Sequence, residues 1–324
     1  MPAASPPPSP AETTSGIHFA LALDGKGGVA PGPAGGRSWI HLDWHACTDW
    51  LSTQPDLDPL VVAALMADDT SPRFHTFDDG AILILRGANH NPGQDPDDMV
   101  SLRLWMSPER LISVSLRRVL AVDQVHERLI GGRGPAAPVE VALALAGALA
   151  DNLKPVVRAI SERLEDLEDS ALDTAPAPLR GDLVALKRQV IWLHRFVRPQ
   201  AEALDELAAA PPPWFPGTAP ERAIEIAHAT ERLAATLDTQ REHSGLILDQ
   251  LRDRQAEAVA TSGLWLTRLA AVFLPLNLLA ALFGANVGGI PGDGHPLGFW
   301  LLGLGCLIVG GLAGTWFLVR RGDD

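Results

Sequence analysis

Cysteine is scarce in this chain, with two in 324 residues, Cys47 and Cys306. So few cysteines exclude a disulfide framework and indicate a reducing compartment. Basic residues are also in the minority, because 26 Lys and Arg face 39 Asp and Glu, giving a formal net charge of -13. Nucleic-acid binding needs clustered Lys and Arg. We therefore expect no nucleic-acid partner, and an acidic domain that attracts cations.

Enzyme motifs are lacking as well: there is no phosphate-binding glycine loop, no Ser/His/Asp signature and no metal motif of catalytic spacing. One short segment carries ligand-type residues at every second position: His41, Asp43, His45, Cys47 and Asp49. A continuous strand would put these on one face, as a metal site requires. The alternative is ordinary framework, in which Cys47 packs as a small apolar residue. The sequence predicts no enzyme and no resident cofactor.

Charge is missing from two long stretches near the end of the chain, Leu269–Ala285 and Leu297–Val319. A bilayer core of about 30 Å needs about 20 apolar helical residues. The second stretch has that length, and the first reaches it if its helix starts near Leu264 and Arg268 extends to the interface. Two such spans predict a membrane protein with the lipid bilayer as a partner.

The positive charges around these spans predict their orientation. Arg252, Arg254 and Arg268 precede the first span, Arg320 and Arg321 follow the second, and the connecting loop has no Lys or Arg. The positive-inside rule then places both termini in the cytoplasm and the loop outside.

The chain before the spans divides by composition. Residues 1–16 are rich in Pro, Ala and Ser and are expected to form a disordered tail rather than a signal peptide. Residues 17–138 are expected to form a cytoplasmic α/β domain, and residues 139–219 a helical region with helices over Val139–Leu149, Pro155–Leu172 and Leu179–Leu207. The expected strands are Ile17–Leu23, Ser38–Trp44, Ala81–Ala88, Val100–Met106 and Arg110–Leu116, and the expected helix between them is Pro59–Met66.

No proline interrupts the chain between Pro220 and Pro275, which predicts one helix that continues into the first span. This helix comprises a stalk over 220–263 and transmembrane helix 1 over 264–285. After it we expect a periplasmic loop over 286–296, transmembrane helix 2 over 297–319 and a cytoplasmic tail over 320–324. An apolar stripe on the stalk favours association between subunits, with packing on its own domain as the alternative. The stripe comprises Ile224, Leu233, Leu237, Leu248, Leu251 and Val259.

The outer end of the first span carries Gly284-Ala285-Asn286, after Phe273-Leu-Pro275 and Leu282-Phe-Gly284. Together with two C-terminal spans and a long helix that continues into the first span, this motif resembles the CorA-type divalent-metal transporters. Their signature at the outer end of the first span is Gly-Met-Asn. The middle residue differs, and the continuation Val287-Gly-Gly-Ile-Pro291 is similar to the ZntB-like branch, which is associated with zinc. Further segments resemble that branch in the same order: Phe19–Val29, Trp39–Leu42, Ser71–Arg73, Arg86–Asn89, Asp97–Ser101 and Leu186–Leu204.

The resemblance implies a funnel-shaped homopentamer in a bacterial inner membrane, with the first spans lining a central pore. It implies transport of a divalent cation, zinc first, with magnesium, cobalt, nickel and cadmium as other candidates. It also implies coupling to protons, although no titratable side chain lies between Leu269 and Ala285. A magnesium or cobalt channel of the same architecture stays open, and so does a membrane-anchored metal sensor.

Within such a pore, Asn286 of each subunit is expected to place amide oxygens in a ring at the outer mouth. Gly284 lets the backbone turn there. By family analogy Asn277 faces the pore, with a helix-to-helix hydrogen bond as the alternative. Leu266 and Leu274 are candidates for a constriction that gates by dewetting.

Three charged or titratable residues are weaker candidates for metal contacts. Asp293 and His295 in the loop either capture a cation or are solvated. Asp249 lies where CorA-type relatives bind a regulatory cation, or it is a solvated surface carboxylate. The first span has no usual zinc ligand, so its amide oxygens favour a hydrated ion.

Overall fold

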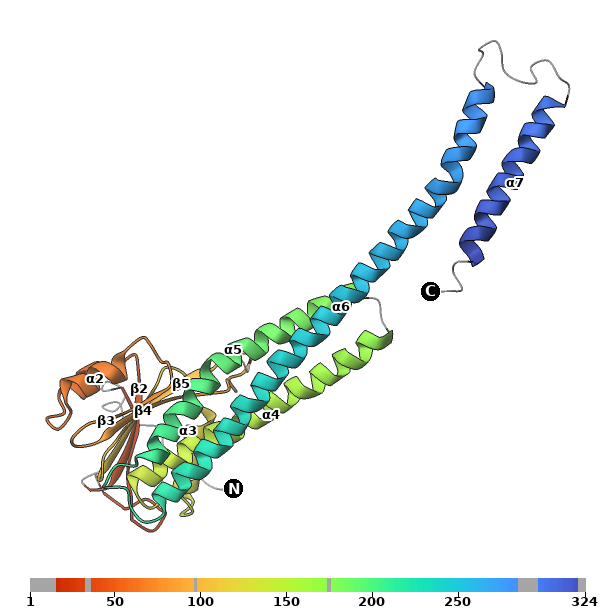
Figure 1. The fold of residues 1–324 in the computed structure, drawn as a ribbon. Helices are drawn as coiled ribbons and strands as arrows, with labels where there is room; N and C mark the ends of the chain where they lie inside the picture. Colours follow the sequence, from red (N-terminus) through yellow and green to blue (C-terminus); the bar gives the residue numbers. More distant parts are fainter. Residues whose placement is uncertain (1–15, 33–35, 96–97, 174–175, 285–296, 320–324) are drawn as a thin grey trace, which may run out of the picture. The chain divides into compact units, whose positions relative to one another are not determined.

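The computed structural model describes residues 16–32, 36–95, 98–173, 176–284 and 297–319 (Figure 1). The chain divides into two compact units, Met1–Leu248 and Asp249–Asp324. The first contains all the strands and most helices of the described residues, and the second contains two apolar helical segments. The expected N-terminal tail up to residue 15 and the expected loop 286–296 lie outside the described residues.

The first unit is built on a six-stranded sheet of order β1-β2-β6-β5-β4-β3. β2 and β6 run parallel, and all other neighbouring strands are antiparallel. Five strands lie within one residue of the expected ends, whereas the four-residue edge strand β3 was not expected. The strands are β1 (Ile17–Ala22), β2 (Ser38–Asp43), β3 (Arg73–Thr76), β4 (Ala81–Gly87), β5 (Val100–Met106) and β6 (Arg110–Ser115).

Helices cover both faces of this sheet, which explains the unbroken apolar run in β4. Ala81, Leu83 and Leu85 pack in the larger core, while Ile82 and Ile84 pack in the smaller core on the other face. A strand buried on both faces needs apolar residues at successive positions. The smaller core includes α1 (Thr48–Ser52) and α2 (Pro59–Met66); the larger includes α3 (Leu120–Ile130), α4 (Pro138–Asp173), α5 (Pro176–Ala209) and the start of α6 (Ala219–Gly284).

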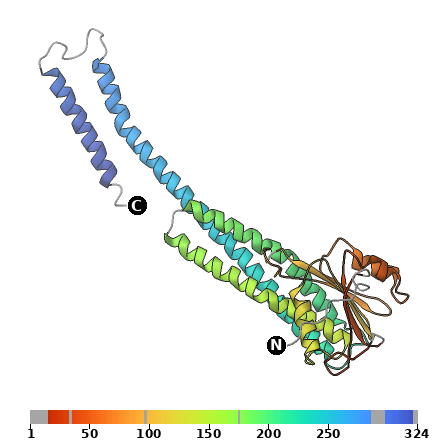
Figure 2. The same cartoon turned by 180° about the vertical axis from the view of Figure 1, so that it is seen from behind.

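In the first unit, α4, α5 and the N-terminal part of α6 lie side by side as three long helices (Figures 1 and 2). The two expected helices before residue 173 are one, because α4 continues through Pro155. A proline removes the hydrogen bond to the carbonyl four residues earlier, here that of Asp151. Pro155 is exposed, so water can solvate that carbonyl. In the same way α5 continues through Pro199.

The uninterrupted helix expected from Pro220 is present as α6, but its apolar stripe is not a surface for a second subunit. Four of the six stripe residues are buried within the chain, and only Ile224 and Val259 are exposed. The buried four are Leu233, Leu237, Leu248 and Leu251. The stripe is therefore explained by packing within one chain, and it carries no argument for association.

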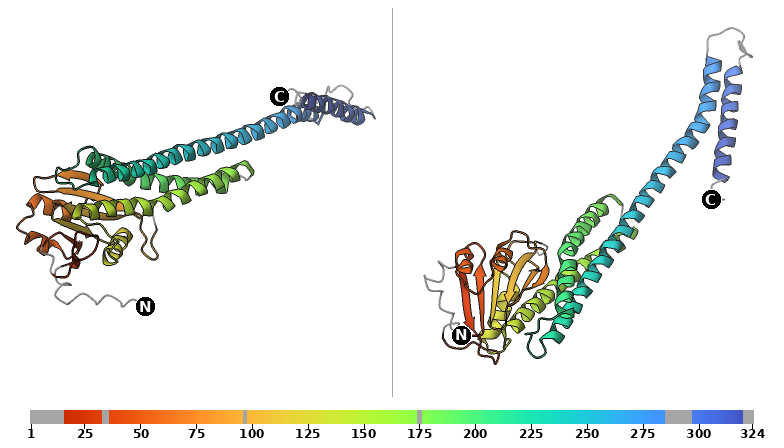
Figure 3. Two further views of the ribbon diagram at one scale, coloured as in Figure 1. Left: turned by 90° about the horizontal axis from the view of Figure 1, so that it is seen from below. Right: turned by 60° about the vertical axis from the view of Figure 1, so that its left-hand side comes forward.

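The second unit pairs the C-terminal part of α6 with α7 (Gly298–Val319), and the two helices lie side by side in every view (Figure 3). Among the described residues, one helix is long and apolar enough to cross a membrane, with a mean hydropathy of 1.6 in its best window and none of that window buried. In α7 the described side chains form a shorter apolar segment, Gly303–Leu312.

Candidate functional site

One face of the apolar part of α6 collects several of the expected site residues. An α-helix turns by about 100° per residue, so Leu266 and Gly284 lie within about 20° of Asn277 around the axis, and Phe273 within about 40°. All four residues are exposed, with 70% of Leu266 and 54% of Phe273 accessible. We call the face formed by Leu266, Phe273, Asn277 and Gly284 the Asn277 face.

Helix α7 packs on the other side of α6. The partly buried residues Val272, Leu276 and Leu279 lie between about 100° and 160° away from Asn277. A Cβ atom built on Gly310 of α7 would lie 3.6 Å from Leu276 Cδ1, an ordinary van der Waals distance. Because α7 occupies that side, the Asn277 face is left uncovered by the described part of the hairpin.

The expected constriction pair is only partly brought together. Leu266 lies on the Asn277 face, but Leu274 lies about 60° from Asn277, at the margin of the face, with 73% of it exposed. Phe273 takes the more central position and was not assigned a role from the sequence. Its spacing of four residues from Asn277 was the signal that could have shown this.

The chemistry that this face offers is limited. Between Leu269 and Gly284, Asn277 is the only side chain with a hydrogen-bonding group. Its amide oxygen is a hard ligand that suits a hydrated cation better than an inner-sphere zinc ion, which prefers nitrogen and sulfur. The other expected site residues, Asn286, Asp293 and His295, lie outside the described residues.

Asp249 pairs with an arginine on its own helix, and a cation site that it would share with another subunit stays a prediction. Its Oδ1 atom accepts a hydrogen bond of 2.7 Å from Nη1 of Arg252, one turn along α6, and both side chains are exposed. Such a pair contributes little to stability. Across the described part of the chain, no three His, Cys, Asp or Glu side chains are grouped to hold a metal ion.

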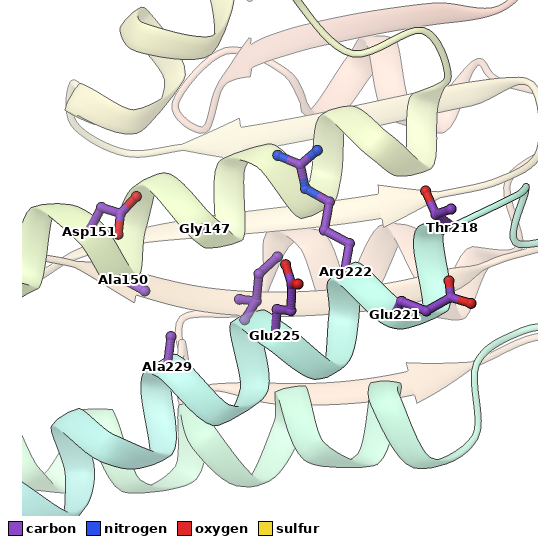
Figure 4. Close-up of a pocket in the computed structure, with 9 residues that line it drawn as sticks. Gly147, Ala150, Asp151, Thr218, Glu221, Arg222, Glu225 and Ala229 are labelled. Atoms are coloured by element: carbon purple, nitrogen blue, oxygen red, sulfur yellow. The ribbon is translucent and has the colours of Figure 1, made fainter.

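A groove between α4 and the start of α6 is lined by acidic side chains (Figure 4). Asp151 comes from α4, and Glu221 and Glu225 come from α6 together with Arg222. Asp151 is bridged to Lys154 at 2.6 Å. The arrangement is a solvated, mixed-charge surface rather than a cation site.

The alternating segment from His41 to Asp49 does not form a metal site either, because β2 ends at Asp43. His41 is buried, its Nδ1 lies 2.8 Å from Ser113 Oγ, and burial lowers its pKa to about 3. Cys47 Sγ lies 3.6 Å from Met66 Sδ in the smaller core, where burial raises the pKa of the thiol to about 11. Both side chains are engaged in internal contacts, and no three ligand-type side chains are grouped among the described residues, so the framework interpretation holds.

The chain is similar to known proteins over most of its length. The family model described as CorA-like Mg2+ transporter protein matches residues 35–321, which include strands β2 to β6, the three long helices of the first unit and both apolar helical segments. This chain belongs to the CorA-like family. Within it, the resemblance drawn from Gly284-Ala285-Asn286 and its continuation is confirmed, because curated ZntB proteins align with nearly the whole chain.

Two relatives of this CorA-like chain are named zinc transport protein ZntB. The protein from Klebsiella pneumoniae is 34% identical over 311 residues, covering 93% of this chain and 94% of its own length. The protein from Pectobacterium carotovorum is 32% identical over 317 residues, with 94% and 95% covered. The family is one of transporters.

Solved structures show the same fold. The full-length CmaX protein superposes with a TM-score of 0.78 at 30% identity, covering 95% of this chain and 98% of its own. The CorA magnesium transporter of Methanocaldococcus jannaschii superposes with a TM-score of 0.74 at 15% identity, covering 87% and 90%. The CorA-like α/β domain with its long helix is thereby confirmed as the fold of this chain.

Proposed function

We propose that this chain transports divalent cations across a bacterial inner membrane, with zinc as the first candidate, along a path lined by the Asn277 face of α6. The observation that carries the proposal is the position of Asn277, the only polar side chain between Leu269 and Gly284, on a face of α6 that α7 does not cover. Family membership and two zinc transport proteins as relatives support the cargo.

The path requires several copies of the chain. One apolar hairpin cannot enclose a polar route through lipid, where every polar group needs a partner. With α6 and α7 both spanning the bilayer and both termini in the cytoplasm, a homopentamer would bring five Asn277 faces to a common axis. The α7 helices would then stand outside the ring of α6 helices, because they pack on the opposite side of α6.

The residues on the Asn277 face favour a hydrated ion. Five amide groups at Asn277, and five more at Asn286, would hold the water shell of the cation. Leu266 and Phe273 present apolar side chains that resist wetting when the ring is narrow, which is how a hydrophobic constriction closes a pore. Zinc selectivity therefore cannot come from inner-sphere ligands in this part of α6, where His, Cys, Asp and Glu do not occur.

The deciding experiment is ion uptake into proteoliposomes that contain the purified full chain, measured for zinc and magnesium with and without an inward proton gradient. We expect zinc uptake that is lost in Asn286→Ala. Dependence on the gradient would support proton coupling. Magnesium uptake without dependence on the gradient would instead favour the CorA-type channel, the second candidate, which the description of the family model favours. Zinc binding without flux of any ion would exclude a transporter and support the remaining candidate, a membrane-anchored metal sensor.

A further inference from the structure

One side of α5 presents aromatic, aliphatic and basic side chains to solvent. Ile191 is 48% exposed and Trp192 is 44% exposed. Arg188 and Arg195 are also exposed, about one turn before and one turn after Trp192. Spacings of three, four and seven residues keep all four side chains on one side of the helix. We call the surface formed by Arg188, Ile191, Trp192 and Arg195 the Trp192 face.

The Trp192 face has the composition of a protein interface. The rings of Trp192 and Phe196 meet edge to face with their centroids 5.5 Å apart, and Arg195 Cζ lies 5.9 Å from the centroid of the Trp192 ring. Trp192 and Arg195 therefore already lie against aromatic rings of α5. Tryptophan and arginine carry much of the binding energy of interfaces, and adjacent exposed apolar side chains mark interaction sites.

A second surface, on α4, has the opposite charge. The exposed charged residues of α4 between positions 158 and 170 are four carboxylates and two arginines, Arg158 and Arg163. The ion pairs that α4 forms among the described residues involve Asp151 and Glu168 instead of these carboxylates. We call the four carboxylates the acidic α4 surface: Glu162, Glu165, Asp166 and Asp169.

Contacts with α6 put the two surfaces at the same level of the bundle. Glu168 of α4 pairs with His243 at 3.1 Å, and His194 of α5 lies 3.0 Å from Asp238. Both helices therefore meet the same short segment of α6, which runs between α5 and α4 in Figure 1. Each surface lies on the side of its helix away from the buried residues. Because those buried residues face the centre of the bundle, the two surfaces point outward in different directions.

Two such surfaces on different sides of one chain favour a contact between copies. If the Trp192 face met its own copy across a two-fold axis, arginine would face arginine, which costs free energy. If it meets the acidic α4 surface of the next copy, Arg188 and Arg195 face carboxylates, with which guanidinium groups form strong hydrogen bonds. A contact between unlike surfaces repeats from copy to copy and closes into a ring when the rotation fits. Because the surfaces lie at one level, the repeat needs no shift along the bundle.

We propose that the Trp192 face of one copy docks on the acidic α4 surface of the next copy. Trp192 and Ile191 form the apolar centre of the contact, and Arg188 and Arg195 pair with the carboxylates. This docking rests on the proposed function only in that the cation path requires several copies. The partner of the first unit is thus the first unit of a second copy.

The test joins two single-cysteine versions of the full chain, in both of which Cys47 and Cys306 are replaced by Ala. One version carries Arg188→Cys and the other Glu165→Cys. The two are co-expressed, purified in detergent, treated with a short bismaleimide and separated under denaturing conditions. We expect a covalent dimer from the mixture and none from either version alone, because unlike surfaces meet. Glu109→Cys in place of Glu165→Cys is the matched control, since Glu109 is an exposed carboxylate between β5 and β6.

Charge reversal checks which side chains pair. Arg195→Glu, added to the Arg188→Cys version, should lower the dimer yield by roughly threefold or more, because a carboxylate then faces carboxylates. Glu162→Arg, added to the Glu165→Cys version, should restore the yield. All these positions are exposed, so each version should fold, and its thermal unfolding midpoint verifies this. If Arg188→Cys fails to fold, Ile191→Cys takes its place.

The outcomes separate this contact from the proposed cation path. An oligomer of the native chain by light scattering, with no dimer from the mixture, overturns the contact and leaves the path intact. A monomeric native chain overturns both. A dimer from either version alone, or an equal yield from the Glu109→Cys control, also overturns the contact, since the copies would then meet through other surfaces or at random.

Discussion

At the scale of single residues, His41 should make the stability of the chain depend on pH. Burial holds its pKa near 3 in the folded protein, with smaller contributions from His18 and His126, against about 6.5 when the chain is unfolded. Between these values the unfolded state binds the extra proton. The free energy of unfolding should therefore be highest above pH 6.5 and fall by on the order of 1 kcal/mol per pH unit as the pH drops toward 3.

The measurement is the thermal unfolding midpoint of the full chain in detergent between pH 7.5 and 4.5, followed by tryptophan fluorescence. His41→Gln should flatten this profile, because it removes the group that titrates. His75→Asn is the matched control, since His75 is exposed on β3 and should leave the slope as it is. An unchanged slope in His41→Gln would assign the pH dependence to other groups.

Asn277 should control flux without controlling assembly. Asn277→Leu removes the one polar group on its face but keeps the helix apolar and of similar volume. We expect divalent-cation flux to fall by roughly fivefold to 150-fold, because the loss of one hydrogen-bonding ring is worth on the order of 1–3 kcal/mol. Leu278→Ala, at an exposed position about 100° away, is the control. Equal flux losses in both variants would indicate general damage to the helix and not a polar lining.

The sequence singles out Asn277, whose role in the pore stays a prediction, but it did not reveal the burial of Arg103. A lone arginine within the run Val100–Met106 reads as a surface residue, since Arg is seldom fully buried. Its burial follows from α1 and α2, which close over that end of the sheet, and this tertiary effect leaves no periodic signal in the strand. The alternation from His41 to Asp49 left a metal site and ordinary framework open. The strand ends at Asp43, so the later residues of the pattern do not share its face, as the framework interpretation expects.

At the scale of elements, the packing of α7 on α6 depends on a small residue at Gly310. A Cβ atom there meets Leu276 at 3.6 Å, so Gly310→Ala should be tolerated, while Gly310→Leu must push the helices apart. Overpacking of this kind costs typically 1–3 kcal/mol. We expect a lower thermal midpoint in detergent for Gly310→Leu. Gly311→Leu is the matched control, because a Cβ there meets nothing within 4 Å; an equal loss there would contradict the assigned contact.

Most elements follow from local patterns, and the exceptions have physical causes. The helix Pro59–Met66 has the ends that were expected. In the structure Asp58 caps it by accepting a hydrogen bond from the Leu60 N–H at 2.7 Å, and Pro59 fits the first turn. The edge strand Arg73–Thr76 was missed, since it is only four residues long, has no fully buried residue and pairs only with β4. The break expected at Pro155 did not occur, because tertiary packing of α4 outweighs one lost hydrogen bond.

At the scale of the whole molecule, burial within one chain removes one of the two sequence-based arguments that several copies of the chain associate. The stalk stripe was an argument for association, but burial within one chain accounts for it. The argument that remains is the polar Asn277 face on a helix too apolar to carry a path alone. A pentamer of the 34.5 kDa chain should have a mass of about 170 kDa after subtraction of detergent, measurable by light scattering.

Mixing subunits distinguishes one shared path from independent ones. If five copies form a single ring, a random one-to-one mixture of wild-type and Asn286→Ala chains leaves only about 3% of the pentamers fully wild type. Where one defective subunit disrupts the ring, flux should then fall far below half. Independent paths would each keep their own activity, and flux would equal half. The measurement is zinc uptake by proteoliposomes that contain co-expressed wild-type and variant chains purified through one tag that both share, beside wild-type chains carrying the same tag. A flux of half in the mixture would exclude a shared central path.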